Sequence, residues 1–254
     1  MNNYIAVQSL VKKEVTRVVR IWKQTILPAV ITSTLYFLIF GTFIGSQIKE
    51  MNGVPYIDFL VPGFIMMSVI TASYSNVASS FFWAKFQKSI EEILVSPMKP
   101  HEVILAFMSG WIVRGFIIAA IIFIIALFFT NASIDNPIMT FLFILFTSSL
   151  FSSAWFFNAF FAKSFDDVQI IPTFVITPMV YLGWVFYSIT LLPPFWKFFS
   201  LINPIYYMVN GLRASMISVS EANVYFSLLA IIVFNIILFY INLRLYKKGY
   251  GLKS

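Results

Sequence analysis

Side chains that could perform chemistry are few in this sequence of 254 residues. It has no cysteine, and its one histidine, His101, cannot form a zinc site alone. It also lacks the glycine-rich run that cradles phosphates and the short motifs of hydrolases, zinc proteases and dinucleotide-binding domains. We therefore expect no catalytic residue, metal or cofactor in this chain, and the sequence argues against a membrane-embedded protease or transferase.

Ionisable groups are scarce in the long apolar runs as well. None of the ten acidic residues falls well inside such a run, although proton- and sodium-coupled carriers bury carboxylates there. One cation, Arg114, does lie inside a run, where a charge costs about 3 kcal/mol on insertion scales. Either Arg114 contacts an anionic substrate or a second copy of the chain, or its helix starts later and Arg114 lies near the cytoplasmic interface.

The elements that position these residues follow from the composition. Hydrophobic residues make up 60% of the chain and charged residues 11%, with a mean hydropathy of +0.88, whereas a soluble domain carries roughly 25% charged residues. A spanning helix needs about 20 mostly apolar residues. Charge-free runs of that length predict a single all-α integral membrane domain over residues 1–254, with six transmembrane helices near 24–45, 59–82, 103–129, 138–161, 168–190 and 224–244.

Basic residues divide unequally between two sets of loops. The N-terminal stretch, the loops before the third and fifth spans and the tail hold most of them, whereas the other loops hold only Lys49, Lys197 and Arg213. The positive-inside bias therefore predicts that both termini are cytoplasmic. It also assigns the net charge of +7 to contacts with membrane lipids rather than with nucleic acid.

Residues 4–23 are predicted to form an interfacial helix that lies in the membrane plane. At helical spacing an apolar stripe faces lipid and a basic face lies opposite. The stripe consists of Tyr4, Val7, Val11, Val15, Val18 and Trp22, and the basic face of Lys13, Arg17 and Arg20. This helix either anchors the chain to anionic headgroups or docks a partner.

A second amphipathic helix is predicted in the cytoplasm, over residues 82–98. A rigid helix at this place would give a soluble partner something to push against, and the alternative is a solvated surface helix. Its proline would end it abruptly. The residues expected to meet the partner are Phe86, Ile90, Glu91, Glu92, Ile93, Leu94 and Pro97.

Residues 193–213 are predicted to form a re-entrant outer segment before the sixth span. Prolines interrupt it, its aromatic rings favour the headgroup region, and Lys197 and Arg213 are expected to hold its ends at water. Irregular backbone at membrane depth needs protein or a wet cavity to cover it. We therefore expect this segment to cover the outer mouth of a pathway, with Trp196, Asn203, Pro204, Tyr206 and Tyr207 as candidate gate residues.

Two shorter motifs concern helix ends and helix packing. Ser164 and Asp167 match a capping box that opens the fifth span, where acidic groups complement the helix dipole. Gly41 and Gly45 stand four residues apart in the first span and permit close packing there. That glycine face is one possible surface for a homodimer.

The order of these elements, together with several phrases, resembles the ABC-2 type transporter permeases along essentially the whole chain. The family's coupling-helix phrase is matched by residues 89–97 (SIEEILVSP), and its outer segment by 192–196 (LPPFW), 203–206 (NPIY) and 211–213 (GLR). The sequence is most similar to the bacterial YadH-like branch through 20–25 (RIWKQT), 165–167 (FDD) and 172–178 (PTFVITP).

The resemblance implies the membrane half of an ATP-driven exporter in a bacterial inner membrane. Similar permeases work as homodimers, each copy docks a separate ATPase subunit that uses the ATP, and substrate passes between the two copies. It implies an amphiphile, a glycan-lipid or a drug as substrate. The competing hypothesis is a membrane scaffold or assembly protein without a pathway, which would have no need of the amphipathic helix at 82–98.

Overall fold

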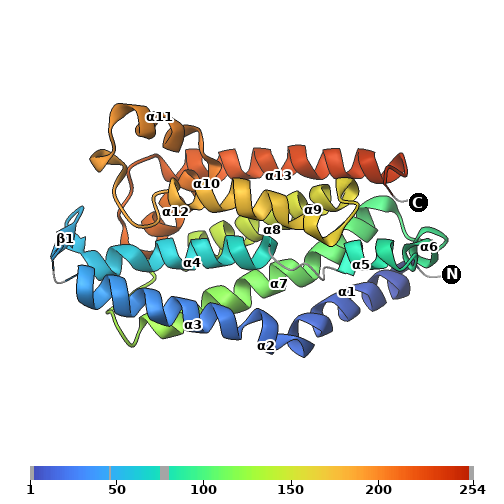
Figure 1. The fold of residues 1–254 in the computed structure, drawn as a ribbon, viewed down its shortest axis with the longest axis horizontal. Helices are drawn as coiled ribbons and strands as arrows, with labels where there is room; N and C mark the ends of the chain where they lie inside the picture. Colours follow the sequence, from blue (N-terminus) through green and yellow to red (C-terminus); the bar gives the residue numbers. More distant parts are fainter. Residues whose placement is uncertain (1–2, 46, 75–79, 252–254) are drawn as a thin grey trace.

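The computed structural model describes residues 3–45, 47–74 and 80–251, which form an elongated bundle of helices (Figure 1). The first part contains α1 (Asn3–Arg20), α2 (Trp22–Thr25), α3 (Leu27–Tyr36), the π-helix η1 (Phe37–Ile44), the strands β1 (Glu50–Met51) and β2 (Val54–Pro55), and α4 (Tyr56–Tyr74). The middle part contains α5 (Ser80–Phe86), α6 (Ile90–Leu94), α7 (Pro100–Ala126) and α8 (Pro137–Phe161). The last part contains α9 (Phe165–Ile171), the π-helix η2 (Pro172–Ile176), α10 (Thr177–Tyr181), the 3-10 helix η3 (Ile189–Leu191), α11 (Pro194–Ile202), α12 (Pro204–Ile217) and α13 (Val224–Lys247).

Within the described residues, five helical stretches are long and apolar enough to cross a bilayer. They are Trp22–Gly41, Tyr56–Tyr74, Pro100–Ala126, Pro137–Phe161 and Val224–Lys247. These stretches coincide with the predicted first, second, third, fourth and sixth spans, which confirms the all-helical membrane class. The predicted second span, 59–82, also covers residues 75–79, which lie outside the described residues.

The region of the predicted fifth span, 168–190, is not one continuous helix. Helix α9, η2 and α10 continue one another and end at Tyr181, so the predicted end at residue 190 was wrong. Pro172 opens the π-helical turn because proline cannot donate the hydrogen bond of a regular helix. Beyond Tyr181 the chain turns inward through Trp184, which has a φ of 65°. A Cβ on Gly63 of α4 would lie 2.5 Å from the carbonyl oxygen of Val185, so glycine allows this close approach.

The outer segment forms two helices instead of an irregular loop. The break falls at Asn203, whose side chain accepts a hydrogen bond from the backbone N–H of Ile205 at 3.0 Å and so caps α12. Pro204 occupies the first turn, where its missing N–H costs nothing. Helix α12 packs against α4, α8 and α13, and Arg213 is 0% exposed. The expectation that Arg213 lies at water was therefore wrong.

The N-terminal amphipathic helix lies along α7. It ends at Arg20, three residues before the predicted end, and α2 and α3 continue the chain into the first span. Leu10, Glu14 and Val18 are buried on the face toward α7, and a Cβ on Gly110 would lie 3.0 Å from the backbone oxygen of Glu14. Part of the stripe predicted to face lipid, including Val18, therefore packs against protein.

The first-span glycines make contacts within the chain. A Cβ on Gly41 would lie 2.4 Å from Cδ1 of Ile57 on α4, and a Cβ on Gly45 would meet the carbonyl oxygen of Gly41. The close approach at Gly41 is thus made to Ile57 of the same chain, and use of this glycine face by a second copy stays a prediction.

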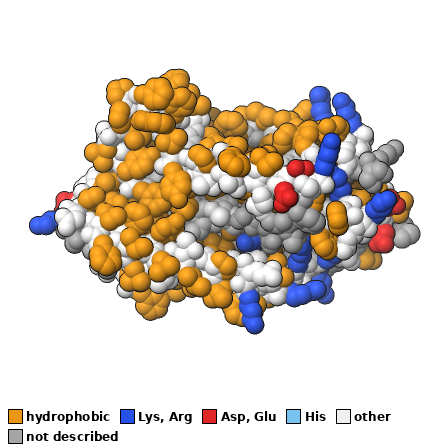
Figure 2. Space-filling view, viewed as in Figure 1, with side chains coloured by type: hydrophobic (Ala, Val, Ile, Leu, Met, Phe, Trp, Pro, Cys, Tyr) orange, Lys and Arg blue, Asp and Glu red, His pale blue; other side chains and the backbone are white. Residues whose placement is uncertain are grey.

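The two ends of the bundle differ in charge. The start of α1 and the end of α13 lie at the same end, and the hairpin of β1 and β2 lies at the other (Figure 1). Most of the Lys and Arg side chains visible on one face gather toward the end with the termini, whereas apolar side chains cover most of the remainder (Figure 2). This distribution agrees with the predicted placement of both termini on one side.

Candidate functional site

A groove with hydroxyl-bearing walls runs between α3, α4 and α10. Two neighbouring cavities, of about 220 Å³ and 80 Å³, share Met67 and Thr71 of α4. The larger one extends toward α2 and α3, and its polar lining residues are Gln24, Thr25, Thr32, Tyr36, Ser68, Thr71 and Arg114. The smaller one extends toward η2 and α10, where Thr177 and Tyr181 line it. In Figure 1, α4 lies between α3 and α10 on the face toward the viewer.

Three threonines in these walls satisfy part of their hydrogen-bonding capacity on their own helix. Thr25 donates to the carbonyl of Ile21 at 3.2 Å, Thr71 to that of Met67 at 2.8 Å, and Thr177 to that of Pro172 at 2.9 Å. Such bonds let an apolar helix carry hydroxyl groups through a bilayer. The groove can therefore present polar oxygen atoms to a ligand inside a membrane.

Aromatic rings close one end of the groove. The ring centroids of Tyr36 and Phe64 lie 5.4 Å apart, and those of Tyr181 and Phe186 lie 5.9 Å apart. Phe186 also lies 6.2 Å from Tyr36, so it joins the α3 wall to the α10 wall. The groove thus combines hydroxyl groups with flat apolar surfaces.

Arg114 lies at the base of the groove and is 6% exposed. Helix α7 begins at Pro100 and ends at Ala126, which places Arg114 in its middle. The alternative of a later helix start was therefore wrong. Its guanidinium lies 5.8 Å from the ring centroid of Trp111, and it lines a small cavity between α1 and α7 together with Glu14. An acidic and a basic side chain thus share the space beneath the N-terminal helix.

The segment predicted as one helix over 82–98 is two short helices, α5 and α6. They are separated by Lys88, whose φ of 61° is left-handed and cannot continue a helix. The turn directs Ile90 into the core, where it is 1% exposed, so the prediction that Ile90 faces a partner was wrong. Ile93 is partly buried, whereas the side chains of Phe86, Glu91, Glu92, Leu94, Val95 and Pro97 are exposed.

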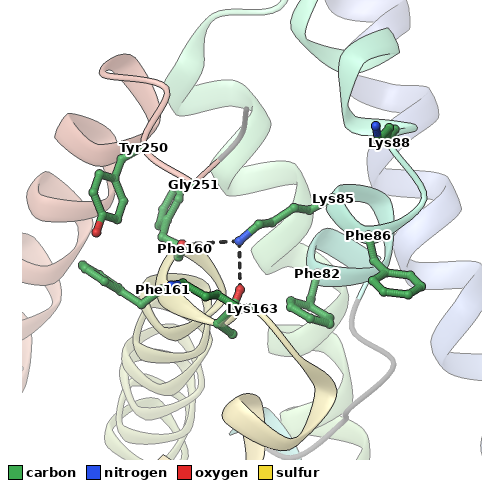
Figure 3. A pocket seen from close by; sticks show the side chains of 10 residues that line it. Phe82, Lys85, Phe86, Lys88, Phe160, Phe161, Lys163, Tyr250 and Gly251 are labelled. Atoms are coloured by element: carbon green, nitrogen blue, oxygen red, sulfur yellow. Dashed lines mark hydrogen bonds between the residues drawn. The ribbon is translucent and has the colours of Figure 1, made fainter. Parts of the chain in front are cut away.

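Lys85 fastens α5 to the end of α8. Its ammonium group donates to the carbonyl oxygens of Ala159 at 3.2 Å, Phe160 at 3.4 Å and Ala162 at 2.9 Å. Figure 3 draws the bonds to Phe160 and Ala162. A cation is favourable here because carbonyls at a helix C-terminus carry partial negative charge. Burial lowers the pKa of Lys85. A displacement of α5 would therefore pull on the end of α8.

The chain between α8 and α9 is held by the predicted capping box, which is confirmed. Ser164 accepts a hydrogen bond from the backbone N–H of Asp167 at 3.1 Å, and the Asp167 carboxylate accepts from that of Ser164 at 3.0 Å. It also accepts from the backbone N–H of Lys163 at 2.8 Å. These bonds from Lys163 and Ser164 lower the pKa of Asp167. The motif joins the end of α8 to the α9–α10 wall of the groove.

The predicted outer-gate residues divide between α11 and α12. Trp196 on α11 is 47% exposed, whereas Tyr206 on α12 is buried with its ring centroid 5.5 Å from that of Trp184. Tyr207 donates to the carbonyl of Leu201 at 2.9 Å, across the break that Asn203 and Pro204 create. The structure thus brings Asn203, Pro204, Tyr206 and Tyr207 together and leaves Trp196 apart.

Arg213 is held at this end by two aromatic rings and three backbone carbonyls, an arrangement that the sequence-based predictions did not include. Arg213 lies between the rings of Phe59 and Trp184, with centroids at 3.8 and 4.2 Å from its guanidinium carbon. It donates to the carbonyl of Phe59 at 3.2 Å and to those of Trp184 and Val185 at 2.9 and 3.4 Å. A single arginine thus holds the break after α10 against α4. One feature of the sequence could have indicated this site: Arg213 directly follows the uncharged run 198–212, which is too short to cross a bilayer.

Comparison with known proteins agrees with this architecture. The model of the ABC-2 type transporter family matches residues 5–217. The chain is 46% identical over 251 residues to "Inner membrane transport permease YadH" of Escherichia coli K12, which covers 99% of this chain and 98% of that protein. It is also similar to "Nodulation protein J" of Sinorhizobium fredii, at 19% identity with 89% and 88% of the two chains covered. The protein of the same name from Neorhizobium galegae is 22% identical, with 84% and 82% covered.

Proposed function

The chain belongs to the ABC-2 type transporter family, and we propose that two copies of it enclose the pathway of an exporter driven by a separate ATPase. Family membership makes it a membrane permease subunit of an ABC transporter, located in a bacterial inner membrane and crossing it several times. We propose six crossings, with α9, η2 and α10 as the fifth, and both termini in the cytoplasm. ATP is used by the partner, since this sequence lacks a phosphate-cradling loop.

The observation that supports the pathway most directly is the polar groove on an outer face of the bundle. Thr32, Thr71 and Thr177 are exposed there, and lipid tails cannot hydrogen-bond to their hydroxyl groups. A second copy placed over this face would remove it from lipid and turn two grooves into one enclosed passage. The exposed hydroxyl groups of the groove therefore support the proposed dimer.

The walls of the groove suit an amphiphile. The threonine hydroxyls can exchange hydrogen bonds with a sugar or headgroup, and the ring cluster around Phe186 offers apolar contact to a chain or to the flat face of a sugar. Arg114 at the base of the groove would attract an anionic group. We therefore propose an amphiphile, a glycan-lipid or an amphiphilic drug as substrate.

We propose that the ATPase docks on the exposed side of α5 and α6. Phe86, Leu94 and Val95 provide apolar contacts, and Glu91 and Glu92 provide charge at the rim. Motion would pass through Lys85 to the end of α8, through the capping box to α9, and from α9 to the groove wall. A scaffold without a pathway would need neither this connected route nor hydroxyl groups on an outer face.

Single cysteines test the pathway, because the natural sequence has none. Thr177→Cys lies on the groove face, and Ile236→Cys on α13 is an exposed control with 64% of its surface accessible. In membranes that contain the ATPase, we expect oxidation to link two copies through residue 177 and not through residue 236. Exclusive linking through residue 236 would place the interface on α13 and refute the proposed pathway.

A further inference from the structure

A basic pocket with aromatic walls lies at the end of the bundle that holds the termini (Figure 3). Its volume is about 470 Å³. One wall is α5 with the turn at Lys88, the second is the end of α8 with Lys163, and the third is the tail with Tyr250 and Gly251. The transport pathway proposed above does not use this pocket.

The tail packs closely against the end of α8. Gly251 has a φ of 64°, and a Cβ there would lie 2.2 Å from the carbonyl oxygen of Phe160. The rings of Tyr250 and Phe161 lie with centroids 5.1 Å apart. Lys85 reaches across from α5 to the carbonyls at the end of α8, as Figure 3 shows. Three separate segments therefore form one cavity.

The charge of the pocket is positive. Lys85, Lys88 and Lys163 line it, and none of the described residues that line it is acidic. Lys85 donates to three carbonyls, whereas the side chains of Lys88 and Lys163 are exposed. The nearby carboxylate of Asp167 accepts backbone hydrogen bonds from residues 163 and 164. The pocket therefore suits an anion that is bound chiefly by Lys88 and Lys163.

We propose that this pocket binds the phosphate headgroup of an anionic phospholipid of the inner leaflet. It lies level with the ends of α8 and α13, where headgroups meet a membrane protein, and basic pockets between spans bind such headgroups. Tyr250 supplies an amphipathic ring of the kind that favours this depth, and Phe161 adds an apolar wall. The bound lipid would join the tail, α8 and the turn before α6.

Lipid retention by the purified chain, without any ATPase, tests this inference separately from the transport function. The chain is placed in nanodiscs of phosphatidylcholine with a minor fraction of phosphatidylglycerol, and the retained lipids are counted by native mass spectrometry. The pocket variant combines Lys88→Asn with Lys163→Gln, since asparagine tolerates the left-handed backbone at residue 88. The matched control, Lys49→Gln with Lys197→Gln, removes equal charge from exposed positions away from the pocket.

We expect the wild type and the control to retain phosphatidylglycerol selectively and the pocket variant to lose that selectivity on the order of tenfold. Unchanged selectivity in the pocket variant, or an equal loss in the control, would overturn the proposal.

Inorganic phosphate is added as a competitor in a second series. If it displaces the lipid completely at millimolar concentration, the pocket binds a soluble phosphate instead. If adding the ATPase abolishes lipid retention, the pocket is part of the protein interface. Either result would overturn the headgroup assignment.

Discussion

The side-chain amide of Asn203 lies 2.5 Å from the carbonyl oxygen of Met179, so the break before α12 is tied directly to α10. The same side chain caps α12 through the N–H of Ile205. One asparagine therefore couples the outer segment to a wall of the polar groove. Its two bonds can be separated by mutation.

Asn203→Ala should lower the stability of the folded chain by about 1 to 2 kcal/mol, because it removes a helix cap and a link to α10. Asn203→Ser should retain the cap and lose only the link to Met179. Thermal unfolding in nanodiscs measures the difference. Equal stability of the alanine and serine variants would mean that the cap contributes nothing.

Arg213→Leu should destabilise the chain by about 3 kcal/mol or more, since three buried carbonyls lose their donor. Arg213→Lys should rescue little, because an ammonium group lacks the planar fork that reaches Phe59 and Trp184 together. The yield of monodisperse protein and its melting temperature measure both effects. Wild-type stability of the lysine variant would show that charge alone suffices.

Two similar substitutions in and beside α6 should have opposite outcomes. Ile90→Asp places a charge in the core and should reduce folding of the permease itself. Val95→Asp changes a residue that is 85% exposed, and it should leave folding intact while weakening ATPase docking. Melting temperature and co-purification with the ATPase separate the two. Loss of docking by a fully folded Ile90→Asp protein would contradict the observed burial of Ile90.

Reversal of the rim charge should weaken docking in a salt-dependent manner. Glu91→Lys combined with Glu92→Lys alters two exposed carboxylates without disturbing the core. Added salt screens such longer-range attraction, so the wild type and the variant should become more alike as ionic strength rises. Affinity for the ATPase across a salt series measures the effect. A difference that salt does not change would remove charge as its cause.

The capping box makes a pH prediction. The pKa of Asp167 is lower in the folded chain than in the unfolded chain. The contribution of this carboxylate to the free energy of unfolding is therefore present above the unfolded pKa of about 3.9, and it is lost as the pH falls through the folded pKa. The stability difference between the wild type and Asp167→Asn should therefore disappear at low pH. Paired melting curves from neutral to acidic pH measure it. A constant difference would exclude titration of this carboxylate.

Much of the fold could be predicted from the sequence because long charge-free runs have few alternatives to crossing a bilayer. The capping box could be predicted as well, since Ser164 and Asp167 interact within a single helical turn. The end of the fifth helical region could not be predicted, because it depends on the close approach of Val185 to Gly63 from a segment distant in the sequence. The turn at Lys88 was also unreadable, since lysine gives no local signal for a left-handed backbone.

The groove was missed for a related reason. Thr71 and Thr177 look alike in a sequence whether they face lipid, protein or a passage, and their meeting around α4 depends on the packing of three helices. Arg213 was assigned to water because an arginine beside an apolar run usually marks an interface. Its aromatic and carbonyl partners come from α4 and from residues 184–185.

The clamp at Arg213 also bears on how the protein is made. All the carbonyl groups that receive its hydrogen bonds belong to Phe59, Trp184 and Val185, which leave the ribosome before it does. The acceptor carbonyls can thus already be in the bilayer when Arg213 is inserted. Synthesis in this order would allow α12 to dock after the segments that bind Arg213 have been made, with α13 following it.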